Sequence, residues 1–320
     1  MTPVEAIIKT QSELKMNEEK WVSRFSDYLA KSVNNISSIV ERRKKFHKWG
    51  NLSVYYTIGR AKDDSSAFDL RYQGQSVGEI HVPKNGQVKL SISNKQYENN
   101  CNKKYLEGYP SSICLPGTYN WDTTEAKAFR AFFKSNPGKS GHPEHKYENL
   151  LLKELSDKYS KTKSLVGIQP VTIGTTTDLF FQMPTPLTAS GTDIIYSEGH
   201  GGIDILARRN GRLTVLELKD EYKESEGPEK VISQATAYAT FLVELCKTDA
   251  RDDFWKLCGF NNKPTGKEVI NVAILMPDPD GKTEPAFAGA LLEVPGSEMK
   301  LELNYIFFDK KTVKITRASF

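Results

Sequence analysis

The chain contains little cysteine, no long apolar segment and no recognisable signal sequence. Only four of its 320 residues are cysteine and none form a CxxC pair, which argues against a disulfide framework and against a zinc ribbon. There is no stretch of about 18 apolar residues, and residues 1–5 lack the basic and apolar regions of a secretory signal. We therefore expect free thiols, a cytoplasmic location and no membrane partner.

The composition suits two globular domains that differ in charge. Hydrophobic residues make up 38% and charged residues 26% of the chain, which excludes disorder and a collagen-like fold. Residues 1–140 hold 22 Lys and Arg against 14 Asp and Glu, a net charge of +8, whereas residues 141–320 hold 22 against 26. This difference favours a polyanion as the partner of the first part and a use for carboxylates in the second.

Basic residues gather in two short runs, Arg42–Lys45 and Arg208–Arg209 with Arg212. Such runs are candidate contacts for the phosphates of a nucleic acid, and an ordinary solvated surface is the alternative.

Hydrophobic periodicity predicts an α+β domain in the first part. Residues 17–48 lack glycine and proline and have apolar residues near helical spacing, so we expect one long or broken helix. Alternating apolar residues over 51–93, with turn signals at Gly74 and Asn85–Gly86, predict a small antiparallel meander. A further helix is expected near 123–134.

A segment rich in glycine and proline, residues 136–143, is the clearest linker. We place the boundary near residue 138, with one domain over 1–138 and a second over 139–320. In order, the second domain is expected to contain a helix over 144–160, a β-rich stretch over 165–183, strands over 203–207 and 213–218, a helix over 228–247, and strands over 269–276, 301–308 and 312–316.

Charged residues interrupt two of these apolar strands. Asp204 lies in the first strand and Glu217 in the second, and the Asn210–Gly211 dipeptide between them favours a hairpin. Two carboxylates brought together repel each other unless they share a proton or a cation, and a hard divalent ion such as Mg²⁺ prefers oxygen ligands. Lys219 follows Glu217 by two residues, so strand alternation directs both side chains to one face.

With these residues the chain resembles the PD-(D/E)XK nuclease superfamily, which has the restriction-endonuclease-like fold. The Glu-x-Lys tripeptide alone is unspecific, because acid-x-Lys recurs elsewhere in the chain. Here, however, it ends an apolar strand, follows Asp204 by thirteen residues and precedes an amphipathic helix. Ile203 occupies the place of the proline in the family's motif.

Two helices complete the resemblance, which covers about residues 145–277. Glu148 in the helix before the strands matches the family's helix acid, and Gln234 with Tyr238 is similar to a Gln-x-x-x-Tyr motif of some members. The resemblance implies an αβββαβ core in the C-terminal domain. Together with the N-terminal α+β domain expected from periodicity, this gives a mixed α/β fold class.

The resemblance also implies a function, namely an Mg²⁺-dependent DNA endonuclease of restriction or defence type, with Mn²⁺ as a substitute ion. Asp204, Glu217 and the main-chain carbonyl of Leu218 are then expected to ligate the metal. Lys219 is expected to orient the attacking water, Glu148 to bind a second metal or its water shell, and Gln234 to assist. DNA is the implied partner, and a homodimer is compatible with the pattern.

Several alternatives stay open on the residues alone. Glu144 is a rival for the role of Glu148, and Asp193 is a rival for that of Asp204, although the shorter hairpin connection favours Asp204. His200 is either a substrate contact or a loop histidine. Asp204, Glu217 and Lys219 together also fit a structural ion-pair cluster. At the level of function, a non-catalytic DNA-binding or assembly subunit and an RNA nuclease are the alternatives.

Overall fold

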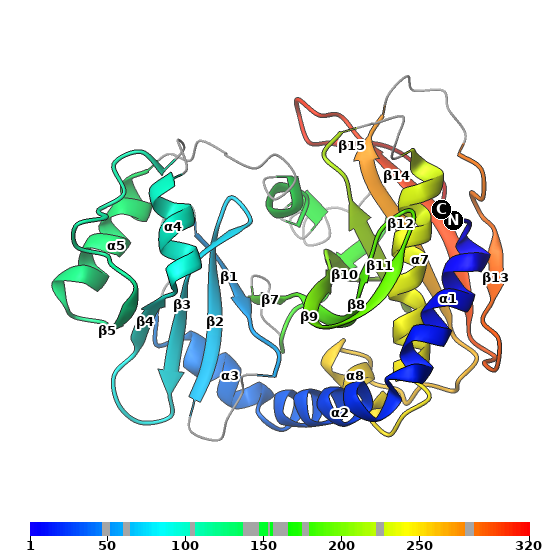
Figure 1. Cartoon of the computed structure of the whole chain (residues 1–320), viewed down its shortest axis with the longest axis horizontal. Helices are drawn as coiled ribbons and strands as arrows, with labels where there is room; N and C mark the ends of the chain where they lie inside the picture. Colours follow the sequence, from blue (N-terminus) through cyan, green and yellow to red (C-terminus); the bar gives the residue numbers. More distant parts are fainter. Residues whose placement is uncertain are drawn as a thin grey trace. The chain divides into compact units, whose positions relative to one another are not determined.

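The computed structural model of the chain (Figure 1) describes residues 1–46, 52–59, 65–102, 106–136, 147–152, 154–155, 166–174, 179–221, 227–278 and 285–320, without the side chains at 199–200. The fold is mixed α/β, as predicted. Its contacts divide the chain into two units. Unit 1 comprises Met1–Ala30, Leu150–Val171 and Gln182–Phe320, and unit 2 comprises Lys31–Asn149 and Thr172–Phe181. Residue 138 lies outside the described residues, so the boundary near it stays a prediction.

Unit 2 is built on a six-stranded sheet. In spatial order its strands are β5 (Gly117–Asn120), β4 (Lys89–Ile92), β3 (Gln75–Pro83), β2 (Ser65–Tyr72), β1 (Leu52–Tyr56) and β7 (Leu179–Phe181). Neighbours are antiparallel except β1 and β7, which are parallel. The predicted meander is therefore present. Gln73 and Gly74 form the turn between β2 and β3 with φ of 51° and 80°, values that favour a tight two-residue connection.

Alternate residues of this sheet form the core of unit 2. Phe68, Leu70 and Tyr72 of β2 are fully buried on one face, as strand alternation requires. Helices α3 (Ile36–Arg43) and α4 (Asn94–Asn102) contact β3, and α5 (Thr124–Ser135) contacts β5. Thr123 caps α5 by accepting the N–H of Ala126 at 3.4 Å. The predicted helix near 123–134 is confirmed.

The basic run at the end of α3 has two kinds of residue. Arg42 is buried and donates from Nη1 to Oγ of Ser66 at 2.9 Å. Arg43 donates to the carbonyl of Phe46 at 3.0 Å and lies over its ring. Lys44 and Lys45 are exposed. The two arginines therefore stabilise unit 2, and only the two lysines remain on the surface for phosphate contact.

Unit 1 contains a seven-stranded mixed sheet. Its spatial order is β13 (Leu291–Glu293), β14 (Lys300–Phe308), β12 (Val269–Pro277), β11 (Arg212–Leu218), β10 (Ile205–Arg209) and β6 (Ile168–Pro170), and β15 (Ile315–Ala318) pairs with the end of β14. Strands β11, β12 and β14 are parallel, and the other neighbours are antiparallel. Strand β12 is buried almost throughout, as its continuous apolar sequence predicts.

Helix α7 (Pro228–Leu245) packs against this sheet and against a two-stranded ribbon of β8 (Met183–Ala189) and β9 (Ile194–Ile203). Pro228 occupies the first turn of α7, where its missing N–H costs nothing. Most side chains of the helix are buried, since both the sheet and the ribbon cover it. Its neighbour α8 (Arg251–Leu257) buries Phe254 and Trp255.

The first thirty residues belong to unit 1. Helix α1 (Pro3–Met16) packs on α7 and on β9, and a capping box between Thr2 and Glu5 begins it. Trp21 and Phe25 of α2 (Glu18–Asn34) meet the Phe241 ring edge-on, with centroids 5.8 and 5.0 Å away. The sequence grouped these helices with the N-terminal domain, whereas their apolar faces are buried against α7. The predicted break in the helix occurs at Asn35, between α2 and α3.

The expectations of free thiols and of no membrane-spanning segment can be compared with the structure. All four cysteines are free, three of them buried and Cys101 exposed. Burial raises the pKa of Cys246 to about 12, so this thiol is a poor nucleophile at neutral pH. Among the described helices, none combines the length and the apolar character that crossing a bilayer requires.

Candidate active site

A tight hairpin brings the predicted acids to one place. Strands β10 and β11 are joined by Asn210 and Gly211, whose φ angles of 49° and 77° are the positive values that a two-residue hairpin turn needs. The register pairs Ile205 with Leu216. Asp204 precedes Ile205, so it lies at the bend next to the end of β11 that carries Glu217.

Asp204 lies at the bend between β9 and β10 and is half-buried. Its Oδ2 accepts the backbone N–H of Leu218 at 2.9 Å. This bond ties the bend to the end of β11, beside Glu217. The close approach of the ribbon strands next to the bend depends on Gly201, because a Cβ there would lie 1.7 Å from the carbonyl oxygen of Leu187.

Glu217 is only 3% exposed and shares its surroundings with a cation. The Nζ atom of Lys219 lies 3.4 Å from its Oε1, and the lysine side chain keeps a fifth of its surface in solvent. A buried carboxylate is costly unless a positive charge or donors compensate it. The ion pair brings the two side chains together on one side, with Glu217 buried and Lys219, just after β11, partly exposed.

Helix α7 adds two polar side chains to this cluster. Burial, followed by the charge of Glu217, raises the pKa of Tyr238 to about 12, while hydrogen bonds from Gln234 and the backbone of Ala189 oppose the rise. Asp204 also acts on this hydroxyl. Tyr238 is therefore a neutral phenol at physiological pH. From the sequence alone we assign no separate role to Tyr238. The sequence signal for one is its spacing of four residues from Gln234, which places both side chains on one face of a helix.

Glu148 belongs to a different network, within unit 2. Its Oε1 is 3.3 Å from Nη1 of Arg71 and accepts the Tyr55 hydroxyl at 3.4 Å. Arg71 also pairs with Asp69 at 2.8 Å and lies over the Tyr55 ring, 4.1 Å from its centroid. Burial and then the Glu148 charge raise the pKa of Tyr55 well above its ordinary value. The predicted role of Glu148 as a helix acid stays a prediction.

The network around Glu148 leads to a prediction about stability. We expect Glu148→Gln to lower the free energy of unfolding by about 2 kcal/mol, because a charge-assisted hydrogen bond to a buried arginine becomes a neutral one. Urea unfolding measures this, and Glu98→Gln, an exposed acid on α4, is the control. A loss, at wild-type stability, of the DNA cleavage that the resemblance implies would instead make Glu148 part of the active site.

The rival acids and the histidine have other positions. Asp193 forms an ion pair with Lys9 of α1, and the hydrogen bond from that lysine is the main reason why its pKa is lowered. This contact explains Asp193 structurally and favours Asp204 as the hairpin acid. Glu144 and the side chain of His200 lie outside the described residues.

The arginines of the hairpin are engaged in structural contacts. Arg208 donates to the carbonyl of Gly259 at 2.7 Å, and Arg209 donates to that of Val166 at 2.7 Å. Arg212 pairs with Glu302 at 2.6 Å. Their predicted contact with phosphate therefore competes with interactions inside unit 1, and we do not include them in the candidate site.

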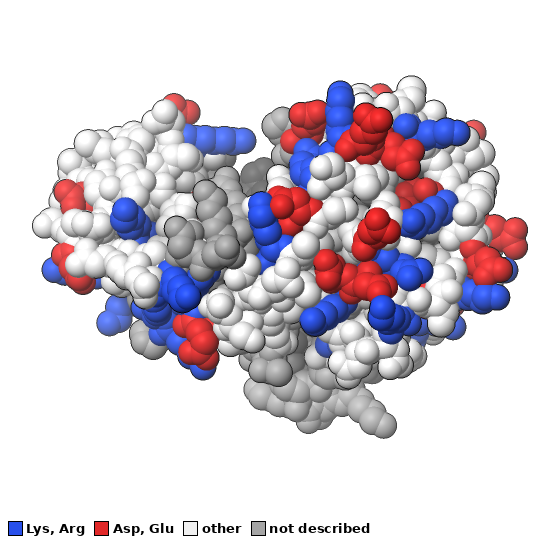
Figure 2. Space-filling model, turned by 90° about the horizontal axis from the view of Figure 1, so that it is seen from below, with Lys and Arg blue, Asp and Glu red and all other residues white. Residues whose placement is uncertain are grey.

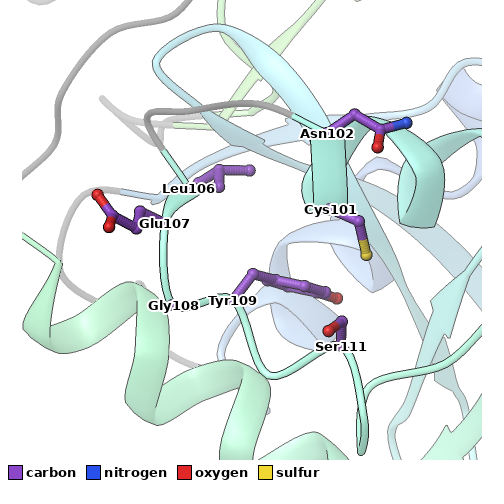
Figure 3. Close-up of a pocket in the computed structure, with 7 residues that line it drawn as sticks. All are labelled: Cys101, Asn102, Leu106, Glu107, Gly108, Tyr109 and Ser111. Atoms are coloured by element: carbon purple, nitrogen blue, oxygen red, sulfur yellow. The ribbon is translucent and has the colours of Figure 1, made fainter.

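A cavity in unit 2 is not the site. It has a volume of about 590 Å³, lies in unit 2 and is lined by residues that include Cys101, Glu107 and Tyr109 (Figure 3). Figure 3 shows the carboxylate of Glu107 and the amide of Asn102 at opposite ends of the cavity, pointing away from each other. A reactive centre needs polar groups that converge on one point.

The donor set of the hairpin suits a magnesium ion. Within the described residues there is no group of three or more His, Cys, Asp or Glu that could hold a metal. Mg²⁺, however, is commonly bound by one or two carboxylates and retains several waters. Asp204, Glu217 and the carbonyl oxygen of Leu218 offer oxygen ligands only, so the chemistry of the site fits this ion.

Comparisons with family models, with curated proteins and with solved structures find no match to this chain. The resemblance to the PD-(D/E)XK superfamily therefore rests on the residues quoted above.

Proposed function

We propose that the chain is an Mg²⁺-dependent nuclease that hydrolyses phosphodiester bonds of DNA, with its active site at the Asp204–Glu217–Lys219 cluster. The observation that carries the proposal is the bond from the Leu218 N–H to Asp204, which joins the acid of one strand to the Glu-x-Lys segment of the next. Two acids and one ammonium at a strand end match what the family resemblance implies.

The order of elements also supports the proposal. A helix over the described residues 147–152 and 154–155 is followed by β6, β10, β11, α7 and β12. Strands β6, β10 and β11 are antiparallel neighbours, and β12 is parallel to β11. This is the arrangement expected for the αβββαβ core of the restriction-endonuclease-like fold, with β7, β8 and β9 as additions between β6 and β10.

Each residue of the cluster would contribute differently. Asp204, Glu217 and the Leu218 carbonyl would hold Mg²⁺, which when bound supplies a Lewis acid at the scissile phosphate. Lys219 would orient the attacking water and stabilise the negative charge that develops on the phosphate. Tyr238, hydrogen-bonded to Gln234, would keep the buried Glu217 in a fixed environment.

A nicking assay on the full-length chain tests this function. Supercoiled plasmid should be cut in Mg²⁺ or Mn²⁺ and remain intact in EDTA, with a 5′-phosphate and a 3′-hydroxyl as the products that the resemblance implies. Asp204→Asn protein, prepared in parallel, controls for a contaminating nuclease. If a single-stranded RNA is degraded while the plasmid is not, the protein is an RNA nuclease. If neither is cut, the non-catalytic reading replaces the proposal.

A further inference from the structure

Four exposed lysines gather at one end of unit 2, and we refer to them as the lysine end: Lys44, Lys45, Lys84 and Lys89. The first two end α3, and the others flank the β3–β4 turn. The Nζ atom of Lys45 donates to the carbonyls of Pro83 at 3.0 Å and Lys84 at 2.8 Å. This side chain therefore fastens the end of α3 to the turn that Lys84 and Lys89 flank.

Little negative charge compensates the lysine end. Lys44 pairs with Glu41 of its own helix at 2.6 Å, with both side chains about two-thirds exposed. Among the described residues, Lys45, Lys84 and Lys89 have no ion pair with an acid. Figure 2 shows several basic side chains on the left of the view, with acidic ones among them. Such a surface attracts a polyanion.

A polar face of the sheet continues from the lysine end. The register aligns His81, Lys89 and Asn120 in one row across β3, β4 and β5. Lys89 and Asn120 are exposed, and His81, whose Nε2 lies 2.7 Å from Oε1 of Glu79, keeps 38% of its side chain in solvent. These side chains alternate with the buried core residues of the same strands. Unlike an apolar face, this surface needs no protein cover, and it offers hydrogen-bonding groups beside the cations.

We propose that the lysine end and the polar row beside it bind the phosphate backbone of duplex DNA. This inference rests on the proposed function, since it takes the substrate of that function as the ligand. Lysine is a flexible point charge suited to phosphates, and each phosphate that is neutralised releases counterions. The binding is thus expected to tolerate any sequence and to depend steeply on salt.

The test compares two triple variants of the full-length chain. Lys44→Gln, Lys84→Gln and Lys89→Gln together remove three charges of the lysine end, while Lys45 is kept because it fastens the turn. The control replaces Lys95, Lys127 and Lys134, exposed lysines elsewhere on unit 2, by Gln. Both variants have the same net charge. The dissociation constant for a labelled duplex is measured in EDTA over a series of KCl concentrations, so that cleavage plays no part.

We expect the first variant to bind more weakly, with a slope of log K against log salt that is shallower by about 2 to 3, since each phosphate contact contributes about 0.9. The slope of the control should differ from that of the wild type by no more than about 0.9, the contribution of one phosphate contact. Equal slopes in wild type and both variants would overturn the proposal, as would equal losses in both variants or a wild-type protein that does not bind duplex. If the protein cuts DNA but the slopes are equal, the proposed function stands and the proposed binding surface is wrong. If the slopes differ but the protein does not cut DNA, the binding surface stands and the proposed function is wrong.

Discussion

We expect Asp204→Asn and Glu217→Gln each to reduce DNA cleavage by about 10³-fold or more, equivalent to ~4 kcal/mol of transition-state stabilisation. Each change removes one negative ligand of the divalent ion and leaves a side chain of the same shape. The asparagine oxygen at 204 can still accept the Leu218 N–H, so the bend between β9 and β10 should persist. Single-turnover cleavage with saturating protein gives the rate.

Fold and metal affinity are followed separately for these two variants. Circular dichroism and the midpoint of thermal unfolding should remain close to those of the wild type. Titration with Mn²⁺ should show weaker binding, because only one of the two carboxylates remains. An exposed acid of unit 1, changed as Glu298→Gln, serves as the matched control. Wild-type cleavage by either variant would show that the hairpin acids are structural.

Lys219→Ala should lower the cleavage rate by roughly 10², the effect of deleting a preorganised electrostatic donor. Lys219 is tied to Glu217 at the end of β11 and is mostly buried, so its charge is directed at the cluster and not at bulk solvent. Affinity for DNA should hardly change. The dissociation constant is measured in Ca²⁺, which we expect to support binding without turnover, and the single-turnover rate in Mg²⁺.

The control for Lys219 is Lys267→Ala, which removes an exposed lysine of the same unit. It should alter neither the rate nor the affinity. Because the alanine at 219 leaves Glu217 without its ammonium, thermal unfolding must be recorded as well. If affinity falls strongly while bound DNA is cut at the wild-type rate, Lys219 is a phosphate anchor and takes no part in the transition state.

Local signals account for what could be predicted about the candidate site. The turn at Asn210–Gly211 needs positive φ at two consecutive positions, which Asn and Gly tolerate best, and it determines the register of β10 with β11. With the register known, Asp204 comes next to the end of β11, where alternation directs Glu217 and Lys219 to one side. These interactions span fewer than twenty residues, and the backbone alone determines them.

Interactions between distant residues escaped prediction. Glu148 is 77 residues from Arg71, and Arg42 is 24 residues from Ser66. A charged side chain on a helix can face solvent, a metal or a buried partner, and its sequence neighbours do not distinguish these cases. The basic run therefore appeared as four equivalent cations, whereas folding buries Arg42 and leaves Lys44 exposed.

The amino-acid sequence by itself determined the mixed α/β class, the meander, the hairpin and the group of two acids with a lysine, because short-range backbone geometry and side-chain alternation specify them. Tertiary structure alone decided that α1 and most of α2 join unit 1. It also decided that Lys45 at the end of α3 bonds to the carbonyls of Pro83 and Lys84 in the β3–β4 turn. An amphipathic helix can bury its apolar face against many different elements, and a surface charge can lie beside many different groups. Only the packing of the whole chain, as of Trp21 and Phe25 on Phe241, selects one of them.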